Sequence, residues 1–288
     1  MPGSQTSQNQ HDIQESRLIS FFGRLNYNLD DKYLVGVSVR RDGSSRFGPG
    51  NEWGMFPAAS VAWRISEESF FQDKTPFSDL KLRASWGKTG NQSFANYQQY
   101  STYLVGNDQA QVQFGNDFIT TIRPSAADPN IKWEETRSWD IGLDYSLLDG
   151  RISGAIDYYV KDTEDLIFTV PVAAGTNLSN YLTTNIGSMK NNGFEFSLGG
   201  DLIMSDDDGL NWNATFNASH TTNELVSITP CAGSAQQIRP GGVSGGVGTL
   251  IQVLQPGSPI NSFFVYEHKR NADGSPVWAD ANGDGTIN

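Results

Sequence analysis

A repeated alternation of apolar and polar residues is the feature that most limits the folds open to this chain. In residues 18–28, Ile19, Phe21 and Leu25 stand at alternate positions, and mostly polar residues stand between them. Successive side chains of a β-strand point to opposite faces, so a period of two predicts a strand with one apolar and one polar face. The pattern recurs and predicts eight strands, at about residues 18–28, 33–41, 57–65, 80–87, 138–147, 151–161, 193–203 and 210–220.

The predicted strands are long, at about 8–12 residues each. Strands of soluble proteins most often have about 5–6 residues, whereas a strand tilted by about 45° needs roughly 9–11 residues to cross the hydrocarbon core of a bilayer. Aromatic residues also stand near the ends of the apolar faces, as Tyr33, Trp86 and Trp139 do. Aromatic rings favour strands in any protein, but their repetition at strand ends is typical of the girdles of membrane barrels.

The connections between the predicted strands alternate in length. Residues 28–32 and 148–150 form tight turns, the second with an Asp-Gly pair that favours a type I′ hairpin. Residues 88–137 and 162–191 form long loops. Outer-membrane barrels show this asymmetry, with short periplasmic turns and long external loops. The link at residues 66–79 fits least well, because it is as long as one of the external loops.

The composition excludes several classes of protein. A membrane-spanning helix needs roughly 20 consecutive apolar residues, and the sequence contains no such run. The formal net charge of −12 argues against a nucleic acid partner, because phosphate contacts come from clustered Lys and Arg. The single cysteine, Cys231, excludes an intrachain disulfide and a zinc site built on cysteines.

Five long runs of sequence carry a family resemblance. They are FFGRLNYNLDDKYLVGVSVRRDGSSRFG (21–48), WGMFPAASVAWRISEESFF (53–71), FSDLKLRASWGKTGNQ (77–92), WEETRSWDIGLDYSLLDGRISGAIDYYVKDTEDLI (133–167) and NIGSMKNNGFEFSLGGDLI (185–203). In this order and spacing, the runs resemble the C-terminal barrel of SusC/RagA-type TonB-linked outer-membrane proteins. The resemblance covers most of residues 18–288, and the Gly-rich stretch at 222–250 matches least.

The resemblance implies the fold and the function. It implies an all-β fold, an antiparallel transmembrane β-barrel segment that is part of a TonB-dependent receptor barrel of about 22 strands around an N-terminal plug. It also implies a place in the cell outer membrane and the import of large nutrients, glycans or oligopeptides, with energy supplied through TonB. A SusD-like surface lipoprotein is the implied partner, and it closes the barrel as a lid.

Residues 1–17 are expected to be a polar, disordered lead, and residues 18–288 a partial barrel truncated at both ends. The lead has neither the basic region nor the apolar region of a signal peptide, and the family's TonB box and plug are missing as well. We therefore expect an internal piece of a longer protein, with Met1 as an internal or artificial start. Lipid cannot satisfy the two unpaired edges of such a piece, so we do not expect it to transport alone.

The strongest local motif for a cofactor lies at the end of the chain. Asp280, Asn282 and Asp284 stand at alternate positions, Gly285 follows, and Thr286 would offer its carbonyl oxygen. This spacing matches the start of a calcium loop, although the carboxylate at position 12 would fall beyond the last residue. A polar turn between strands explains the same residues, so Ca²⁺ binding and a purely structural turn both stay open.

The sequence contains no catalytic constellation, and we expect no enzyme activity. His11, His220 and His268 lie far apart without metal-ligand spacing, and the Gly-rich run 241–248 (GGVSGGVG) lacks the Lys and the following Ser or Thr of a phosphate-binding loop. Some aromatic residues of the long loops could stack on sugar rings or pack the loop against itself, and the sequence favours neither. These residues are Tyr97, Tyr100, Tyr103 and Trp133.

The alternative interpretation is a secreted β-sandwich or an adhesin-like binding module with a calcium loop. A glycan hydrolase is a more distant third, since it would need a pair of opposed carboxylates at a fixed separation. The faces of the strands discriminate the first two. A sandwich would bury one set of apolar residues between two sheets, whereas a barrel would expose the same set to lipid. The set is Ile19, Val37, Ile141, Ile156, Phe196 and Phe216.

Overall fold

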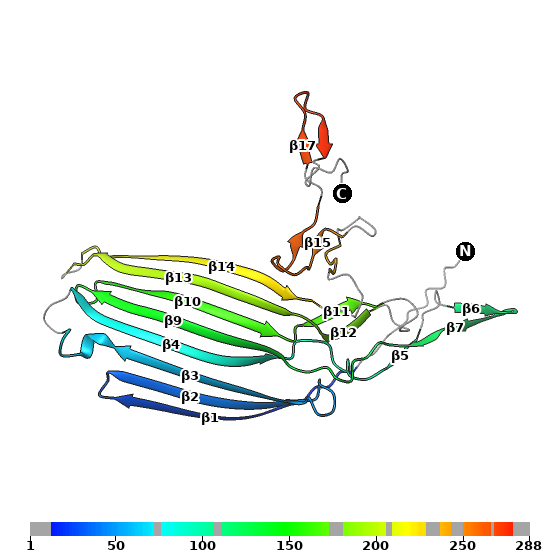
Figure 1. The fold of residues 1–288 in the computed structure, drawn as a ribbon, viewed down its shortest axis with the longest axis horizontal. Coiled ribbons are helices and arrows are strands. Elements are labelled where there is room, and N and C mark those ends of the chain that lie inside the picture. Colours follow the sequence, from blue (N-terminus) through cyan, green and yellow to red (C-terminus); the bar gives the residue numbers. More distant parts are fainter. Residues whose placement is uncertain are drawn as a thin grey trace.

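Eight long strands form one antiparallel sheet in the computed structural model (Figure 1). The structure describes residues 13–71, 76–105, 111–172, 181–205, 209–228, 237–242, 250–265 and 268–278. The order across the sheet is β1-β2-β3-β4-β9-β10-β13-β14, so each long strand pairs with the long strand that precedes it in the chain. Their bounds are Leu18–Leu29, Tyr33–Ser44, Trp53–Arg64, Phe77–Asn91, Glu134–Leu147, Ile152–Glu164, Ser188–Ile203 and Trp212–Ser227, in that order.

Each of these strands overlaps one range predicted from the alternation, and most run further. β4 ends at Asn91 rather than near residue 87, and β14 continues to Ser227 rather than 220. The extra residues are mostly polar, but their backbone groups still pair with β9 and β13. A hydrogen-bond ladder requires only backbone groups, so the strands continue after the apolar alternation has ended.

Short turns join the strands at one end of the sheet. Asp149 and Gly150 have φ angles of 56° and 91°, as a type I′ turn requires, and Asp30 and Asp31 are also left-handed, with φ of 53° and 55°. The link at residues 66–79, which did not fit the alternation of short and long connections, also lies at this end of the sheet. It contains the 3-10 helix η1 (Ile65–Glu67), and Arg64 just before it donates its N–H to the carbonyl oxygen of Lys32 in the first turn.

The long loops lie at the other end and contain short strands of their own. β11 and β12 form a hairpin close to the loop ends of β10 and β13, and the hairpin of β6 and β7 projects away from the sheet (Figure 1). The bounds are β5 Tyr103–Val105, β6 Gln111–Phe114, β7 Asp117–Thr120, β8 Ile122–Pro124, β11 Ile167–Pro171, β12 Tyr181–Asn185, β15 Gln252–Val253, β16 Ser262–Phe263, β17 His268–Arg270 and β18 Pro276–Trp278.

The buried side chains gather at this loop end and not along the sheet. One cluster consists of Phe47, Phe56, Ile131 and Trp133. The other joins the β11–β12 hairpin to the end of β14 and the segment after it, and consists of Leu166, Val170, Ile186, Leu225, Ile228, Ile238 and Leu254. The loops therefore have packed cores of their own.

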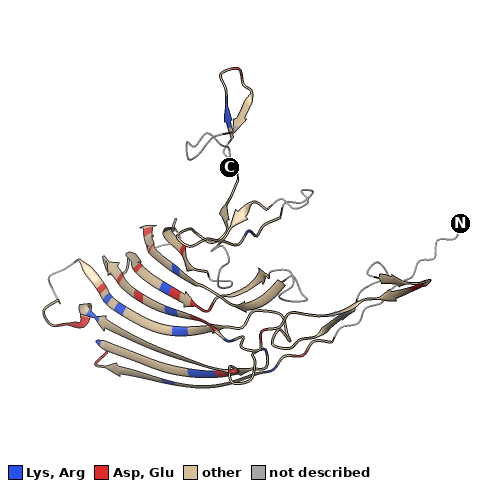
Figure 2. Cartoon of the chain, turned by 45° about the vertical axis from the view of Figure 1, so that its right-hand side comes forward, with Lys and Arg blue, Asp and Glu red and all other residues tan. Residues whose placement is uncertain are grey.

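The apolar face of the sheet is uncovered. Ile19, Ile141 and Phe216 are 55%, 52% and 58% exposed, and no second sheet packs on this face among the described residues. The β-sandwich alternative is therefore wrong, because a sandwich would bury these side chains. The sheet curves as an open trough in which β1 and β14 remain edges, so the described strands do not close a barrel (Figure 2). Across the described ranges, no helix has both the length and the apolarity needed to cross a bilayer.

Candidate functional site

The face of the sheet opposite the apolar residues carries the charges, and we call it the polar face. One row of directly paired residues runs across it from Arg83 on β4 through Gly142 on β9 and Asp157 on β10 to Glu195 on β13. Figure 2 shows basic and acidic segments side by side on these neighbouring strands. The alternation of the sequence places these side chains on one face, and the register brings them together.

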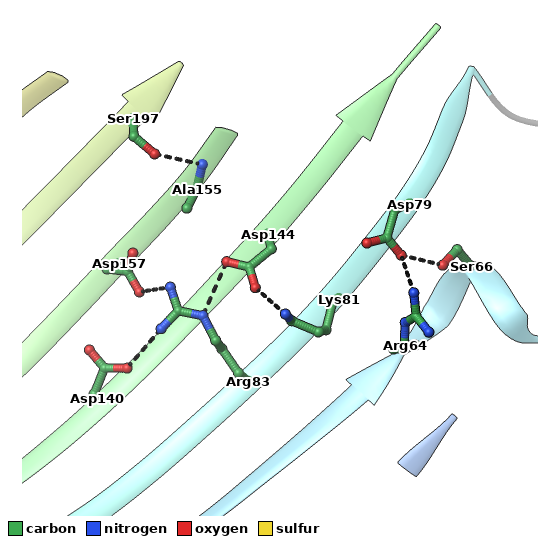
Figure 3. Close-up of polar contacts among 10 residues, drawn as sticks. All are labelled: Arg64, Ser66, Asp79, Lys81, Arg83, Asp140, Asp144, Ala155, Asp157 and Ser197. Carbon is green, nitrogen blue, oxygen red and sulfur yellow. Dashed lines mark hydrogen bonds and ion pairs between the residues drawn. The ribbon is translucent and has the colours of Figure 1, made fainter. Parts of the chain in front are cut away.

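Arg83 is the centre of an ion network on the polar face (Figure 3). Its Nη1 lies 3.3 Å from Asp140 Oδ1, its Nε lies 3.1 Å from Asp144 Oδ1, and its Nη2 lies 2.5 Å from Asp157 Oδ1. Lys81 adds a second cation, with its Nζ 2.7 Å from Asp144 Oδ2. The Arg83 side chain is about one third exposed, so these pairs lose less to the competition of water than fully exposed ion pairs do.

The network itself carries a small net negative charge. Its members are two cations and three carboxylates, and Glu195 on the next strand adds a further carboxylate. Two hollows flank the network. One, of about 440 Å³, lies over β1 to β4 and reaches Arg83. The other, of about 360 Å³, lies between Asp157, Glu195 and the β14 residues Asn217 and Ser219. A charged and hollowed face of this kind resembles the polar inner wall of a wide barrel.

A pair of tryptophans lies on the apolar face toward the loop end. Trp86 on β4 and Trp139 on β9 are directly paired, with ring centroids 6.1 Å apart, and Trp139 is 60% exposed. Charged residues begin two positions further along each strand, where Lys88 and Arg137 pair with each other in the register. Aromatic rings between the apolar residues and the charged residues of a strand occupy the position of the interfacial girdle of a membrane barrel.

A second aromatic group marks the turn end of the apolar face. The hydroxyl of Tyr33 donates to Glu68 Oε1 at 2.6 Å, and the indole N–H of Trp63 donates to the same oxygen at 3.1 Å. Lys32 Nζ lies 3.4 Å from the other oxygen. The hydrogen bond from Tyr33, with further contributions from Trp63 and Lys32, holds the pKa of Glu68 below its usual value. The apolar face is thus bounded by aromatic rings and polar groups at both ends.

The loop aromatics lie in different surroundings. Trp133 is 5% exposed and packs on Phe47, with ring centroids 4.6 Å apart, so it packs the loop against itself. Tyr103 is 74% exposed. Tyr97 and Tyr100 line a cavity of about 300 Å³ at the loop end. Other walls of that cavity come from residues that the sequence did not single out, because no local pattern marks them.

The calcium motif lies outside the described residues, as do its members Asp280, Asn282, Asp284 and Thr286. Its binding of Ca²⁺ stays a prediction. Within the described ranges, no group of three or more His, Cys, Asp or Glu side chains is arranged to hold a metal ion.

Comparisons with known proteins agree with this geometry. Residues 1–246 match the family model described as TonB dependent receptor-like, beta-barrel. The chain is 41% identical over 275 residues to the TonB-dependent receptor SusC of Bacteroides thetaiotaomicron, an alignment that covers 94% of this chain and 27% of that protein. It is 34% identical over 272 residues to the TonB-dependent receptor P3 of Formosa agariphila, which covers 93% of this chain and 26% of that protein.

The solved structures point to the same relatives. The structure of the RagAB peptide importer in the closed-closed state superposes with a TM-score of 0.78 at 27% identity, over 96% of this chain and 30% of that chain. The structure of the RagAB peptide transporter superposes with a TM-score of 0.77 at 28% identity. The chain thus spans between a quarter and a third of the length of these relatives. The resemblance inferred from the sequence is confirmed.

Proposed function

This chain belongs to the TonB dependent receptor-like β-barrel family, and we propose that it forms part of the wall of an outer-membrane transporter that imports large nutrients, glycans or oligopeptides. The observation that carries the proposal is the two-faced sheet. One face exposes Ile141 and Phe216 between aromatic groups, and the other carries the Arg83 network. In a barrel the first face contacts lipid and the second lines the lumen.

The partners proposed for the whole protein follow from the same family. A SusD-like surface lipoprotein would cover the loop end, where the buried clusters hold the long loops in shape. TonB would supply energy through the N-terminal part of the whole protein. The acidic charge of the chain supports a function without nucleic acid. A Ca²⁺ ion held by residues 280–286 remains part of the proposal, as a structural ion of a loop.

The proposal includes no catalytic step. The clustered carboxylates Asp140, Asp144 and Asp157 are each within 3.3 Å of the Arg83 guanidinium. Each of these carboxylates is thus engaged in an ion pair with a cation of the sheet. The network therefore suits a structural and electrostatic role in the wall better than acid–base catalysis.

The test uses the full-length protein that contains this chain, in its native outer membrane. Deletion of the gene should abolish growth on one class of large nutrient, either oligosaccharides or oligopeptides, and leave growth on the monomers intact. Loss of TonB should have the same effect as the deletion. Normal uptake of both oligomer classes in the deletion strain, or uptake without TonB, would contradict the proposal.

A further inference from the structure

Arg41 places a cation on the apolar face of the sheet. In the register it pairs with Phe21 on β1 and with Met55 on β3, and directly paired residues of an antiparallel sheet lie on the same face. Phe21 and Met55 are 63% and 56% exposed, and Arg41 is exposed as well. The cation therefore lies among side chains that contact lipid in a barrel.

No carboxylate of the described residues pairs with Arg41. Its guanidinium Cζ lies 4.8 Å from the centroid of the Trp53 ring, and no ion pair or side chain hydrogen bond joins it to any other described residue. Arg40, the preceding residue, lies on the polar face and differs in this respect, because its Nε is 2.7 Å from Asp42 Oδ1. The five N–H donors of the Arg41 guanidinium are thus available to an anion from outside the described chain.

The ring of Trp53 positions the guanidinium. Trp53 pairs with Gly43 on β2 and its indole lies over that residue, since a Cβ atom on Gly43 would be 2.9 Å from the ring. The ring of Phe21 stacks with the indole, with centroids 6.3 Å apart and planes inclined by 22°. A guanidinium that lies on an indole is held by the cation–π attraction and keeps its planar set of donors for a bidentate contact.

The position of Trp53 along β3 gives the depth of Arg41 in the membrane. Trp53 and Trp63 lie on the same face of β3, ten residues apart. At roughly 3.3 Å per residue and a strand tilt of about 40°, they are separated by about 25 Å along the membrane normal, which is the height of the apolar band of outer-membrane barrels. Trp63 belongs to the aromatic group at the turn end. Trp53 and Arg41 therefore lie at the opposite interface, on the side of the long loops (Figure 1), where lipid head groups begin.

We infer that Arg41 binds the phosphate group of a lipid of the outer leaflet. The guanidinium donates two N–H bonds to the phosphate oxygens, and the acyl chains of the same lipid contact the exposed side chains of Val39 and Met55 beside it. A free phosphate ion would gain the first contact without the second. The inference goes beyond the proposed function, because this site lies on the lipid side of the wall and takes no part in the passage of a nutrient.

The experiment measures lipid binding to the full-length protein that contains this chain, purified in detergent, by native mass spectrometry. The probes are monophosphoryl lipid A and the same lipid after enzymatic removal of its phosphate. The unchanged protein should bind the phosphorylated lipid about fivefold more tightly, the change that one basic residue makes at an anionic membrane surface. Arg41→Gln should bind the two lipids equally. The unfolding temperature of this variant in detergent should not change, because Arg41 is exposed and has no carboxylate partner among the described residues.

The matched control is Arg40→Gln, which removes the same charge from the neighbouring residue on the polar face. Its preference for the phosphorylated lipid should equal that of the unchanged protein. Equal binding of the two lipids by the unchanged protein, a full preference in Arg41→Gln, or an equal loss in Arg40→Gln overturns the inference. Displacement of the lipid by inorganic phosphate at the same concentration also overturns it, because the site would then bind free phosphate. All these outcomes are measured without nutrient uptake, so each leaves the proposed transport function standing.

Discussion

Arg83 and Asp157 form an ion pair with 2.5 Å between Nη2 and Oδ1, although a whole strand, β9, separates the strands on which they lie. The residue of β9 between them is Gly142, which pairs with Arg83 on one side and with Asp157 on the other. The guanidinium reaches across the strand because Gly142 has no side chain in its path. A Cβ atom at this position would lie 2.6 Å from Cζ of Arg83.

Gly142→Ala should therefore destabilise the protein by displacing Arg83 from Asp157. We expect a loss of about 1–3 kcal/mol, the usual cost of an added methyl group in a filled space. The measurement is the thermal unfolding of the full-length protein in detergent. Gly199→Ala is the matched control, because a Cβ atom there would meet its nearest neighbour, Cγ2 of Thr215, at an ordinary 3.6 Å. Equal effects of the two substitutions would show that the contact of Arg83 with Asp157 over Gly142 does not contribute to stability.

Acid should weaken the contact between Glu68 and the aromatic residues Tyr33 and Trp63. Because the pKa of Glu68 is lowered in the folded protein, its contribution is complete above the unfolded pKa, about 4.3, and is lost as the pH falls through the folded value. Glu68→Gln should therefore lower the unfolding temperature at pH 7 and have a smaller effect at pH 3. Glu67→Gln controls for the loss of a nearby charge. An effect of Glu68→Gln that does not change with pH would contradict this assignment.

Trp139 should contact lipid, and Trp133 should not. Trp139 is 60% exposed on the apolar face, whereas Trp133 is 5% exposed in the loop cluster. In liposomes with brominated acyl chains, Trp139→Phe should remove part of the fluorescence that bromine quenches. Trp133→Phe should remove only fluorescence that bromine leaves unchanged. Quenched fluorescence that is lost in Trp133→Phe but retained in Trp139→Phe would contradict the contact of the apolar face with lipid.

The loop cluster should depend on Leu225 and not on its neighbour. Leu225 is fully buried at the loop end of β14, and Val226 is 52% exposed. Leu225→Ala should cost about 2–5 kcal/mol in local stability, whereas Val226→Ala should cost little. Limited proteolysis of the external loops in intact cells measures the difference. Equal cleavage rates for the two variants would mean that this cluster does not hold the loops.

The amino-acid sequence by itself determined the strands and their two faces. The alternation around Ile19, Ile141 and Phe216 depends only on the local geometry of a strand, in which neighbouring side chains point to opposite sides. The strand ends were less predictable, as the polar extension of β4 to Asn91 shows. Backbone pairing continues there after the apolar alternation has ended, so the side chain pattern does not mark the end of the strand.

Only the tertiary structure decided which residues meet. The register of three strands brings Arg83 to Asp140, Asp144 and Asp157, and nothing near Arg83 in the sequence specifies those partners. The packing of distant loops likewise buries Gln99 against Ser45 and separates Trp133, which is buried, from Tyr100, which lines a cavity. The physical reason is the distance along the chain between the residues that interact. Periodicity is a property of a few neighbouring residues, whereas a site depends on the pairing of strands and loops that are tens of residues apart.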